Sequence, residues 1–342
     1  MRSLFTEALK TCIAALLYYS GACWLFARWR LRNRAVVLMY HRVLAPDQTD
    51  LSFSASSIVV TPETFERQMR LLHRWFNPVE AKKLLSMLSG EIDWLPRSCL
   101  VTFDDGWFDN AENALPILSK TRIPATIFLA TGFIGTQDCF WQERLTALLY
   151  EEWRKQGIKS TILRDVGATH LLTDGTPNVR EQIRDMVTSI KGWPRADIAS
   201  LINRIAINYP SATSPSSVDR FMTWDDARRL QASGWVTLGS HAHSHTPLTM
   251  LTEGALNDDL AQANAILNTE LGERTRLFAY PNGDHDGRTS SAVHSAGHPL
   301  AFTTESGLVA PGDNRLSIKR INISEVGTDS NARFLCRLFG WF

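Results

Sequence analysis

Short apolar runs alternate with amphipathic stretches along most of the chain. The runs at residues 100–103, 125–129 and 236–238 are typical of strands buried in a parallel sheet. The stretch 62–75 follows the helical period and has Thr61 in front of it as a cap. Further helices are predicted at 80–88, 107–118, 224–232 and 257–271, and further strands at Leu277 and Ala301. This alternation predicts an α/β fold and is the one that a barrel requires.

The alternation is interrupted in the middle of the chain. Residues 142–153 and 179–190 have helix-like patterns without intervening strands, and the Pro/Ser-rich run YPSATSPSSV follows from Tyr209. We interpret residues 136–220, approximately, as a helical insertion into the barrel. An insertion of this length is expected to form a cap over the mouth of the barrel.

Polar side chains follow two of the predicted strands. Asp104 and Asp105 come directly after 100–103, and His241 and His245 follow 236–238. The carboxyl ends of strands are where α/β folds bind ligands. One carboxylate and two imidazoles are sufficient to hold a divalent metal with open coordination positions, and the other carboxylate can then serve as a base. Neighbouring residues at a strand end point in different directions, so the two aspartates are expected to have different roles.

Each of these two groups also has an ordinary structural interpretation. Asp-Asp-Gly after a strand is typical of a turn or a helix cap. His241 and His245 are four residues apart, which places both rings on one face if the chain turns helically before Pro247, and such a pair is often only a polar helix face. The occurrence of both groups at strand ends of one α/β chain favours the metal site.

Four motifs carry a family resemblance. The runs VVLMYHRV (36–43), VTFDDGWFDN (101–110), MTWDDARRLQASGWVTLGSHAHSHTPL (222–248) and LFAYPNGDHD (277–286) resemble those of the polysaccharide deacetylases, also called carbohydrate esterase family 4 or the NodB-homology domain. The resemblance covers residues 36–325 or so, with the insertion in the middle. The order and spacing of the four motifs make it specific.

The resemblance implies a fold, an activity and a set of roles. The fold would be a distorted (β/α) barrel with fewer regular strands than eight. Asp104 would be the general base, and Asp105, His241 and His245 would bind the metal, usually zinc and sometimes cobalt or nickel. Family members remove N- or O-acetyl groups from sugars such as N-acetylglucosamine polymers.

The chemistry of the residues agrees with this assignment. A bound metal lowers the pKa of its water, and Asp104 can take the remaining proton during attack on an acetyl carbonyl. The oxyanion that forms needs a donor, and the turn from Tyr280 to Gly283 is the expected source. Pro281 has no N–H, so the main chain of Asn282 is the candidate, and Tyr280 is expected to contribute to substrate binding. The alternative is a Pro-Asn-Gly turn without a catalytic role.

The chain departs from the family pattern at two places. Many members have an arginine that braces the base two residues before the proline of the last motif, where this chain has Ala279. Arg320 and Arg42 lie near predicted strand ends and could reach the mouth to take its place, but we expect both to be surface or structural arginines. Many members also supply the leaving group's proton from a Leu-x-His motif, which is absent after residue 300. The remaining candidates are His285, His294, His298, His170 and His41.

Among these histidines, His41 has the most informative position. It ends the apolar run VVLMY and is therefore expected at the same mouth as the two aspartates. A residue there can donate a proton or only support the site, and the supporting or purely structural role is an equally good interpretation.

The N-terminal segment is apolar and is followed by positive charge. Residues 11–27 contain no charged side chain, and as one helix they would rise roughly 26 Å, slightly less than the hydrocarbon thickness of about 30 Å. The four arginines Arg28, Arg30, Arg32 and Arg34 favour a cytoplasmic face and contact with anionic lipid. We therefore expect membrane association, with a signal peptide and a periplasmic or exported protein as one alternative. An amphipathic helix packed on the barrel is the other.

Composition limits the function classes. A chain of 342 residues with 44% hydrophobic residues is consistent with one barrel and additions, divided as an N-terminal segment 1–35 and a catalytic domain 36–342. The net charge of +1 and the lack of a basic stripe argue against a nucleic-acid partner. Five cysteines at 12, 23, 99, 139 and 336 have no spacing that predicts a zinc ribbon or a disulfide framework.

These observations together predict a metal-dependent carbohydrate deacetylase. It would hydrolyse N- or O-acetyl groups of an acetylated polysaccharide, oligosaccharide or lipid-linked glycan near a membrane, with a divalent metal, zinc above all, as cofactor. One alternative is a hydrolase of another non-peptide C–N bond, such as a cyclic amide or a formyl group. The other is a glycan-binding barrel without turnover, an interpretation favoured by Ala279 and the absent late histidine.

Overall fold

The computed structural model describes residues 2–168, 178–209, 216–272 and 277–341, and these form two compact units. The barrel unit consists of Met1–Ala45, Ser57–Thr136 and Met222–Phe342. The inserted unit consists of Pro46–Ser56 and Gln137–Phe221. The inserted unit thus contains most of the stretch in which the strand and helix alternation is interrupted, together with a short segment from near the N-terminus.

The barrel unit is built on a parallel sheet. Eight of the described strands form it in the order β10-β1-β5-β6-β7-β8-β9, with β4 also paired to β5. Every strand pair in this sheet is parallel. The strands are β1 (Ala35–Tyr40), β4 (Asn77–Pro78), β5 (Ser98–Phe103), β6 (Ala125–Leu129), β7 (Val236–Ser240), β8 (Leu277–Ala279), β9 (Leu300–Phe302) and β10 (Ile321–Asn322). A separate parallel pair joins β2 (Arg42–Val43) to β3 (Val59–Val60).

The strands are apolar on both faces because both faces are covered. Every residue of β1, β5 and β6 is buried, as expected for strands enclosed between a core and a layer of helices. One face contributes Val37, Leu100, Phe128 and Phe302 to a shared core. The sheet is a curled, open half-barrel, so the predicted distorted α/β barrel is confirmed.

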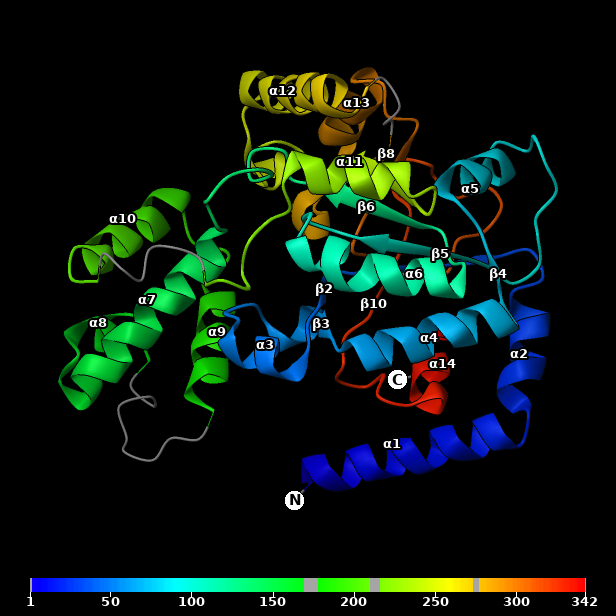
Figure 1. Cartoon of the computed structure of the whole chain (residues 1–342), viewed down its shortest axis with the longest axis horizontal. Coiled ribbons are helices and arrows are strands. Elements are labelled where there is room, and N and C mark those ends of the chain that lie inside the picture. Colours follow the sequence, from blue (N-terminus) through cyan, green and yellow to red (C-terminus); the bar gives the residue numbers. More distant parts are fainter. Residues whose placement is uncertain (1, 169–177, 210–215, 273–276, 342) are drawn as a thin grey trace. The chain divides into compact units, whose positions relative to one another are not determined.

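A layer of helices covers the sheet (Figure 1). They are α4 (Pro62–Trp75), α5 (Ala81–Leu88), α6 (Leu115–Thr121), α11 (Trp224–Ala232), α12 (Glu253–Leu271), α13 (Gly287–Ser295) and α14 (Asn331–Leu338). The prediction for 62–75 coincides with α4, whose cap Thr61 accepts a hydrogen bond from the Thr64 N–H at 3.2 Å. The predicted helix 107–118 instead begins as a π-helical turn at Asn110–Ala114 and continues as α6.

The N-terminal segment forms two helices. They are α1 (Arg2–Tyr19) and α2 (Ala22–Arg30), bent by 76° at the break. A single helix over 11–27 is therefore wrong, because Gly21 adopts the left-handed conformation with φ of 79°, which glycine enters without a steric penalty. Among the described residues, no single helix has the length and apolarity of a membrane span, although α1 and α2 taken together meet that criterion.

The inserted unit has its own hydrophobic core. Its helices are α3 (Pro46–Leu51), α7 (Trp141–Gln156), α8 (Thr161–Asp165), α9 (Val179–Ser189) and α10 (Arg195–Ala206). Side chains from α7, α8, α9 and α10 are buried together. The segment 46–56 joins this unit through the Ser52 hydroxyl, which donates to Asp219 Oδ1 at 2.6 Å. Residues 210–215 of the predicted Pro/Ser-rich run lie outside the described residues.

Candidate active site

The two aspartates follow β5 in a strained turn. Asp105 has φ of 77° and Gly106 has φ of 84°. The positive φ of Gly106 favours glycine, and a Cβ atom there would also lie 2.7 Å from Ile134 Cδ1. A left-handed conformation at a residue other than glycine is costly and is concentrated at functional sites. The turn separates the neighbouring carboxylates, as the sequence predicted for adjacent residues at a strand end.

The two histidines follow β7 on a loop that is not helical. His241 comes directly after the strand, while Ala242 and His245 have φ of 63° and 54°. The helical turn that would place both rings on one face is therefore not formed, since Ala242 and His245 are left-handed. Asp259 of α12 fixes the loop because its carboxylate accepts hydrogen bonds from the N–H groups of His243 and Ser244 at 2.7 and 3.0 Å.

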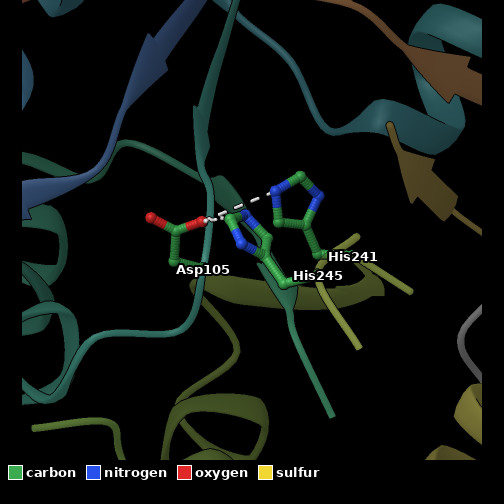
Figure 2. A group of neighbouring side chains, drawn as sticks. All are labelled: Asp105, His241 and His245. Carbon is green, nitrogen blue, oxygen red and sulfur yellow. Dashed lines mark ion pairs between the residues drawn. The ribbon is translucent and has the colours of Figure 1, made fainter. Parts of the chain in front are cut away.

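The loop and the turn bring three ligand-type side chains together. Nε2 of His241 lies 3.5 Å from Asp105 Oδ1, and Nε2 of His245 lies 3.3 Å from the same oxygen. Figure 2 shows both imidazoles directed at Asp105. All three donor atoms lie within 4.8 Å of one another. Donor atoms bound to one zinc ion at tetrahedral angles are separated by roughly 3.3–3.5 Å. The donor set and its spacing therefore fit a divalent cation.

Two hydrogen bonds orient these ligands. The indole N–H of Trp107 donates to Asp105 Oδ2 at 2.8 Å, which leaves Oδ1 toward the histidines. Nδ1 of His241 lies 2.7 Å from the carbonyl oxygen of Ala279, so Nδ1 carries the proton and Nε2 is the free ligand atom. Outer partners of this kind fix ligand orientation and tautomer in metal sites.

The electrostatics of the donor set favour a cation. Burial alone would raise the pKa of Asp105, but its contacts with His241 and His245 outweigh burial and hold that pKa well below its usual value. Burial lowers the pKa of His245 and so favours the neutral, metal-binding form. Burial also opposes protonation of His241, yet the charge of Asp104 and the contact with Asp105 raise its pKa.

Asp104 is held by an arginine from a distant part of the chain. Nη1 and Nη2 of Arg320 donate to Oδ1 and Oδ2 of Asp104, each at 2.7 Å, and both side chains are buried. The expectation that Arg320 is a surface or purely structural residue is wrong, because it forms a bidentate pair with the candidate base. Burial would raise the pKa of Asp104, but Arg320 and then His241 lower it, so the carboxylate stays ionised.

Arg42 pairs with a different aspartate, Asp109, which agrees with the structural role that the sequence predicts for it. Its Nε donates to Asp109 Oδ2 at 2.8 Å, and its guanidinium lies 4.1 Å from the ring centroid of Trp107. Asp109 also accepts the N–H of Val43 at 2.6 Å. Arg42 is therefore linked to the candidate metal ligands through Trp107, which bonds to Asp105.

Tyr280 and Asn282, the predicted substrate-binding and oxyanion-binding residues, lie just after β8. Asn282 has φ of 60° in the turn after β8, and its carbonyl accepts the Thr304 hydroxyl at 3.1 Å. Tyr280 is fully buried, and its main-chain N–H donates to Phe302 while its hydroxyl donates to the Leu316 carbonyl. These hydrogen bonds are internal to the fold, so the expectation that Tyr280 side-chain or main-chain donors face a substrate has no support.

The histidines that are candidate proton donors lie in different surroundings. His41 follows β1, whose last residue Tyr40 pairs with Phe103, so it lies at the same strand ends as Asp104. Burial lowers the pKa of His41, and the charges of Asp105 and Asp104 oppose this shift. His285 stacks on Tyr280 with centroids 5.3 Å apart, His298 is buried against Phe278, and His294 lies on α13. His170 lies outside the described residues.

Two supporting residues escaped the sequence analysis. The sequence pattern marks Trp107 only as the start of a predicted helix, and it assigns no functional role to Asp259. A signal for Asp259 was present, because it shares the helical stripe of Leu256, Leu260 and Ala263. A carboxylate on a buried helix face requires hydrogen-bond partners, and it finds them in the histidine loop.

Comparison with known proteins gives this architecture a family. The family model for polysaccharide deacetylases matches residues 95–301, more than half of the chain. The chain belongs to the polysaccharide deacetylase family, which confirms the resemblance seen in its motifs. It is thereby a member of a class of hydrolases that act on acetyl groups of polysaccharides.

Similar sequences and structures support the assignment. YxkH of Bacillus subtilis is 21% identical over 289 residues, which span 84% of this chain and 71% of the relative. The poly-β-1,6-N-acetyl-D-glucosamine N-deacetylase of Staphylococcus aureus is 29% identical over 133 residues, or 37% of this chain and 46% of the relative. IcaB from Ammonifex degensii has a TM-score of 0.58 at 21% identity and covers 89% of this chain and 97% of its own.

A second solved structure agrees with the first. The Streptococcus pyogenes deacetylase PplD, in complex with acetate, has a TM-score of 0.57 at 17% identity. It covers 89% of this chain and 98% of its own. At these identities the two structures establish a shared fold.

Proposed function

We propose that the protein is a metal-dependent N-deacetylase of a glycan that contains N-acetylglucosamine. The observation that carries the proposal is the convergence of Asp105, His241 and His245, next to an ionised Asp104 that takes no part in that donor set. The N-deacetylase named among the relatives supports the choice of an acetamido sugar over an acetate ester. The donor set contains one oxygen and two nitrogens, which favours zinc and also accommodates cobalt or nickel.

Each residue near the donor set has a separate task. When bound, a divalent cation supplies a Lewis acid for the acetyl carbonyl and acidifies the attacking water. Asp104 accepts the proton of that water, and Arg320 keeps the carboxylate ionised and fixed in orientation. The Asn282 N–H, in a left-handed turn at the carboxyl end of β8, remains the proposed donor to the oxyanion.

His41 is our candidate for protonation of the leaving amine. Its Nδ1 atom is buried and has no hydrogen-bond partner among the described residues. Replacement of His41 by Gln should lower turnover of an amide substrate by about 10²–10⁴-fold. An aryl acetate, whose leaving group needs no proton, should lose much less. Equal losses on both substrates would assign His41 a structural role, and His285→Gln serves as the control.

Release of acetate tests the proposed activity directly. Purified full-length protein should release acetate from β-1,6-linked N-acetylglucosamine oligomers, lose this activity with a chelator and regain it with zinc or cobalt. Asp104→Asn should lower the rate by about 10²–10⁴-fold with the metal content unchanged. His245→Ala should instead remove most of the metal. Asp225→Asn is the matched control, because that side chain is 89% exposed.

The same assay separates the two alternatives. Release of formate, or opening of a cyclic amide, in place of acetate release would indicate a hydrolase of another C–N bond. Binding of the glycan without any product would indicate a barrel that has lost turnover. The absence of an arginine at Ala279 no longer favours that last alternative, because Arg320 holds the base.

A further inference from the structure

We propose that α1 and α2 form an in-plane docking surface for anionic lipid bilayers. The described residues expose thirteen large apolar side chains, and seven of these lie within residues 9–29. They are Leu9, Ile13, Leu16, Tyr19, Trp24, Leu25 and Trp29, which we call the apolar face. A concentration of this kind on one short segment marks an interaction site.

The opposite side of each helix is packed on the barrel unit. Ala14 of α1 is buried with Ala332 and Cys336 of α14, and Tyr18 stacks on Trp75 with centroids 5.7 Å apart. On α2, Cys23 and Ala27 are buried. The apolar face is therefore the outer side of helices whose inner side belongs to the fold, which is the arrangement of a helix that lies in an interface.

Inner-side contacts also bind the helices to the C-terminal region. Arg333 of α14 donates to Glu7 of α1 at 2.6 Å, and Phe26 of α2 contacts the rings of Phe339 and Trp341. Movement of α1 and α2 into a bilayer as a spanning pair would break these contacts. Docking in the plane of the surface preserves all of them.

The positive charge of the segment favours an anionic lipid surface as its binding partner. Residues 8–46 contain no Asp or Glu, while Arg28, Arg30, Arg32 and Arg34 lie at and just beyond the end of the apolar face. The guanidinium of Arg28 lies 4.7 Å from the ring centroid of Trp24, so charge and aromatic surface occur together. Trp and Arg side chains that contact each other suit the headgroup region, and each such cation strengthens binding to an anionic surface by about fivefold. A cytoplasmic leaflet, which carries anionic lipid, remains the predicted location.

Vesicle binding of the full-length protein tests this surface independently of catalysis. The protein should sediment with vesicles containing one third phosphatidylglycerol and only weakly with pure phosphatidylcholine vesicles. Leu25→Ser with Trp29→Ser should weaken binding by at least about tenfold. Arg28→Ser with Arg32→Ser should weaken binding to anionic vesicles by roughly 30-fold, or about fivefold per charge. Met250→Ser with Val326→Ser, which replaces exposed apolar residues elsewhere, should leave binding unchanged.

Three results would overturn the proposal. The first is vesicle binding that none of the α2 variants changes. The second is a dimer that Leu25→Ser with Trp29→Ser dissociates, in the absence of vesicle binding, which would assign the apolar face to a second copy of the chain. The third is retention in vesicles after an alkaline carbonate wash, which would indicate a spanning segment. Unchanged thermal unfolding of each variant ensures that lost binding reflects the surface.

Discussion

Two buried Asp–Arg pairs lie in the same barrel unit and have different consequences. Arg320 grips both oxygens of Asp104, whose pKa is lowered by Arg320 and His241 despite burial. Arg42 donates from Nε to Asp109, whose pKa is raised because burial outweighs the charge of Arg42. The same two residue types therefore produce a carboxylate held ionised at the candidate site and a carboxyl whose charged form is disfavoured. The surrounding charges, and not the pair itself, set the difference.

The largest expected effect comes from Arg320. Arg320→Met should lower deacetylation by about 10²–10⁴-fold, because Asp104 loses the cation that keeps it ionised and oriented. It should also cost about 3–5 kcal/mol of unfolding free energy, since a buried carboxylate is left unpaired. Acetate release and urea unfolding measure the two effects. Arg320→Lys, which keeps the charge but not the bidentate geometry, should fall between wild type and Arg320→Met.

A double variant separates stability from catalysis at this pair. Asp104→Asn with Arg320→Met removes both charges, so it should be more stable than Arg320→Met alone and still inactive. Activity of Arg320→Met within tenfold of wild type would show that Asp104 does not depend on its arginine.

Trp107 should have the next largest effect. Trp107→Phe removes the N–H donor to Asp105 Oδ2 but keeps an aromatic ring beneath Arg42. Loss of an outer partner of this kind lowers metal affinity by about 10–100-fold. Titration of zinc into the chelator-treated protein measures the change, and an unaltered affinity would restrict Trp107 to packing.

Arg42 sharpens the comparison by its smaller effect on catalysis. Arg42→Met should cost about 3–5 kcal/mol of unfolding free energy, as the Arg320 variant does. The activity of each folded, metal-loaded molecule should nevertheless fall less than about tenfold, because Arg42 pairs with Asp109, outside the donor set, and is linked to that set through Trp107. A loss of activity equal to that of Arg320→Met would remove the distinction between the two pairs.

Asp259 should give the smallest effect. Asp259→Asn keeps the side-chain shape but has one acceptor oxygen for two main-chain donors, those of His243 and Ser244. A buried N–H left without an acceptor costs about 1–3 kcal/mol. We expect a loss of that size in urea unfolding and only a few-fold loss in zinc affinity, since the loop keeps its other contacts.

The sequence predicted the parts of the molecule that depend on local pattern. The strand at Ala125–Leu129 and the helix at Pro62–Trp75 coincide with the predicted ranges, because apolar period and capping are local properties. The meeting of Asp105 with His241 and His245 was also anticipated, since the carboxyl ends of parallel strands share one edge.

Other features depend on contacts that no local pattern contains. Arg320 reaches Asp104 across more than two hundred residues of sequence. Ala242 and His245 are left-handed, so the chain does not turn helically between the histidines, and the alanine at 242 gives no signal of such a conformation. Gly21 does signal a possible break in the helix, but the uncharged, apolar composition of residues 11–27 favours one continuous helix.

Gly135 and Met222 of the barrel unit lie side by side although they are far apart in the sequence. The N–H of Gly135 donates to the carbonyl of Met222 at 2.9 Å, so the chain leaves β6 and returns toward β7 at adjacent points. The residues from Gln137 to Phe221 therefore leave and re-enter the barrel unit at neighbouring points, so their length has little effect on the pairing of β6 with β7. Exchange of this excursion for a short glycine linker should therefore retain the sheet register, provided that Pro46–Ser56 is exchanged with it, because Ser52 bonds to Asp219 of the excursion. The two segments of the inserted unit thus form a module that is replaceable only as a whole.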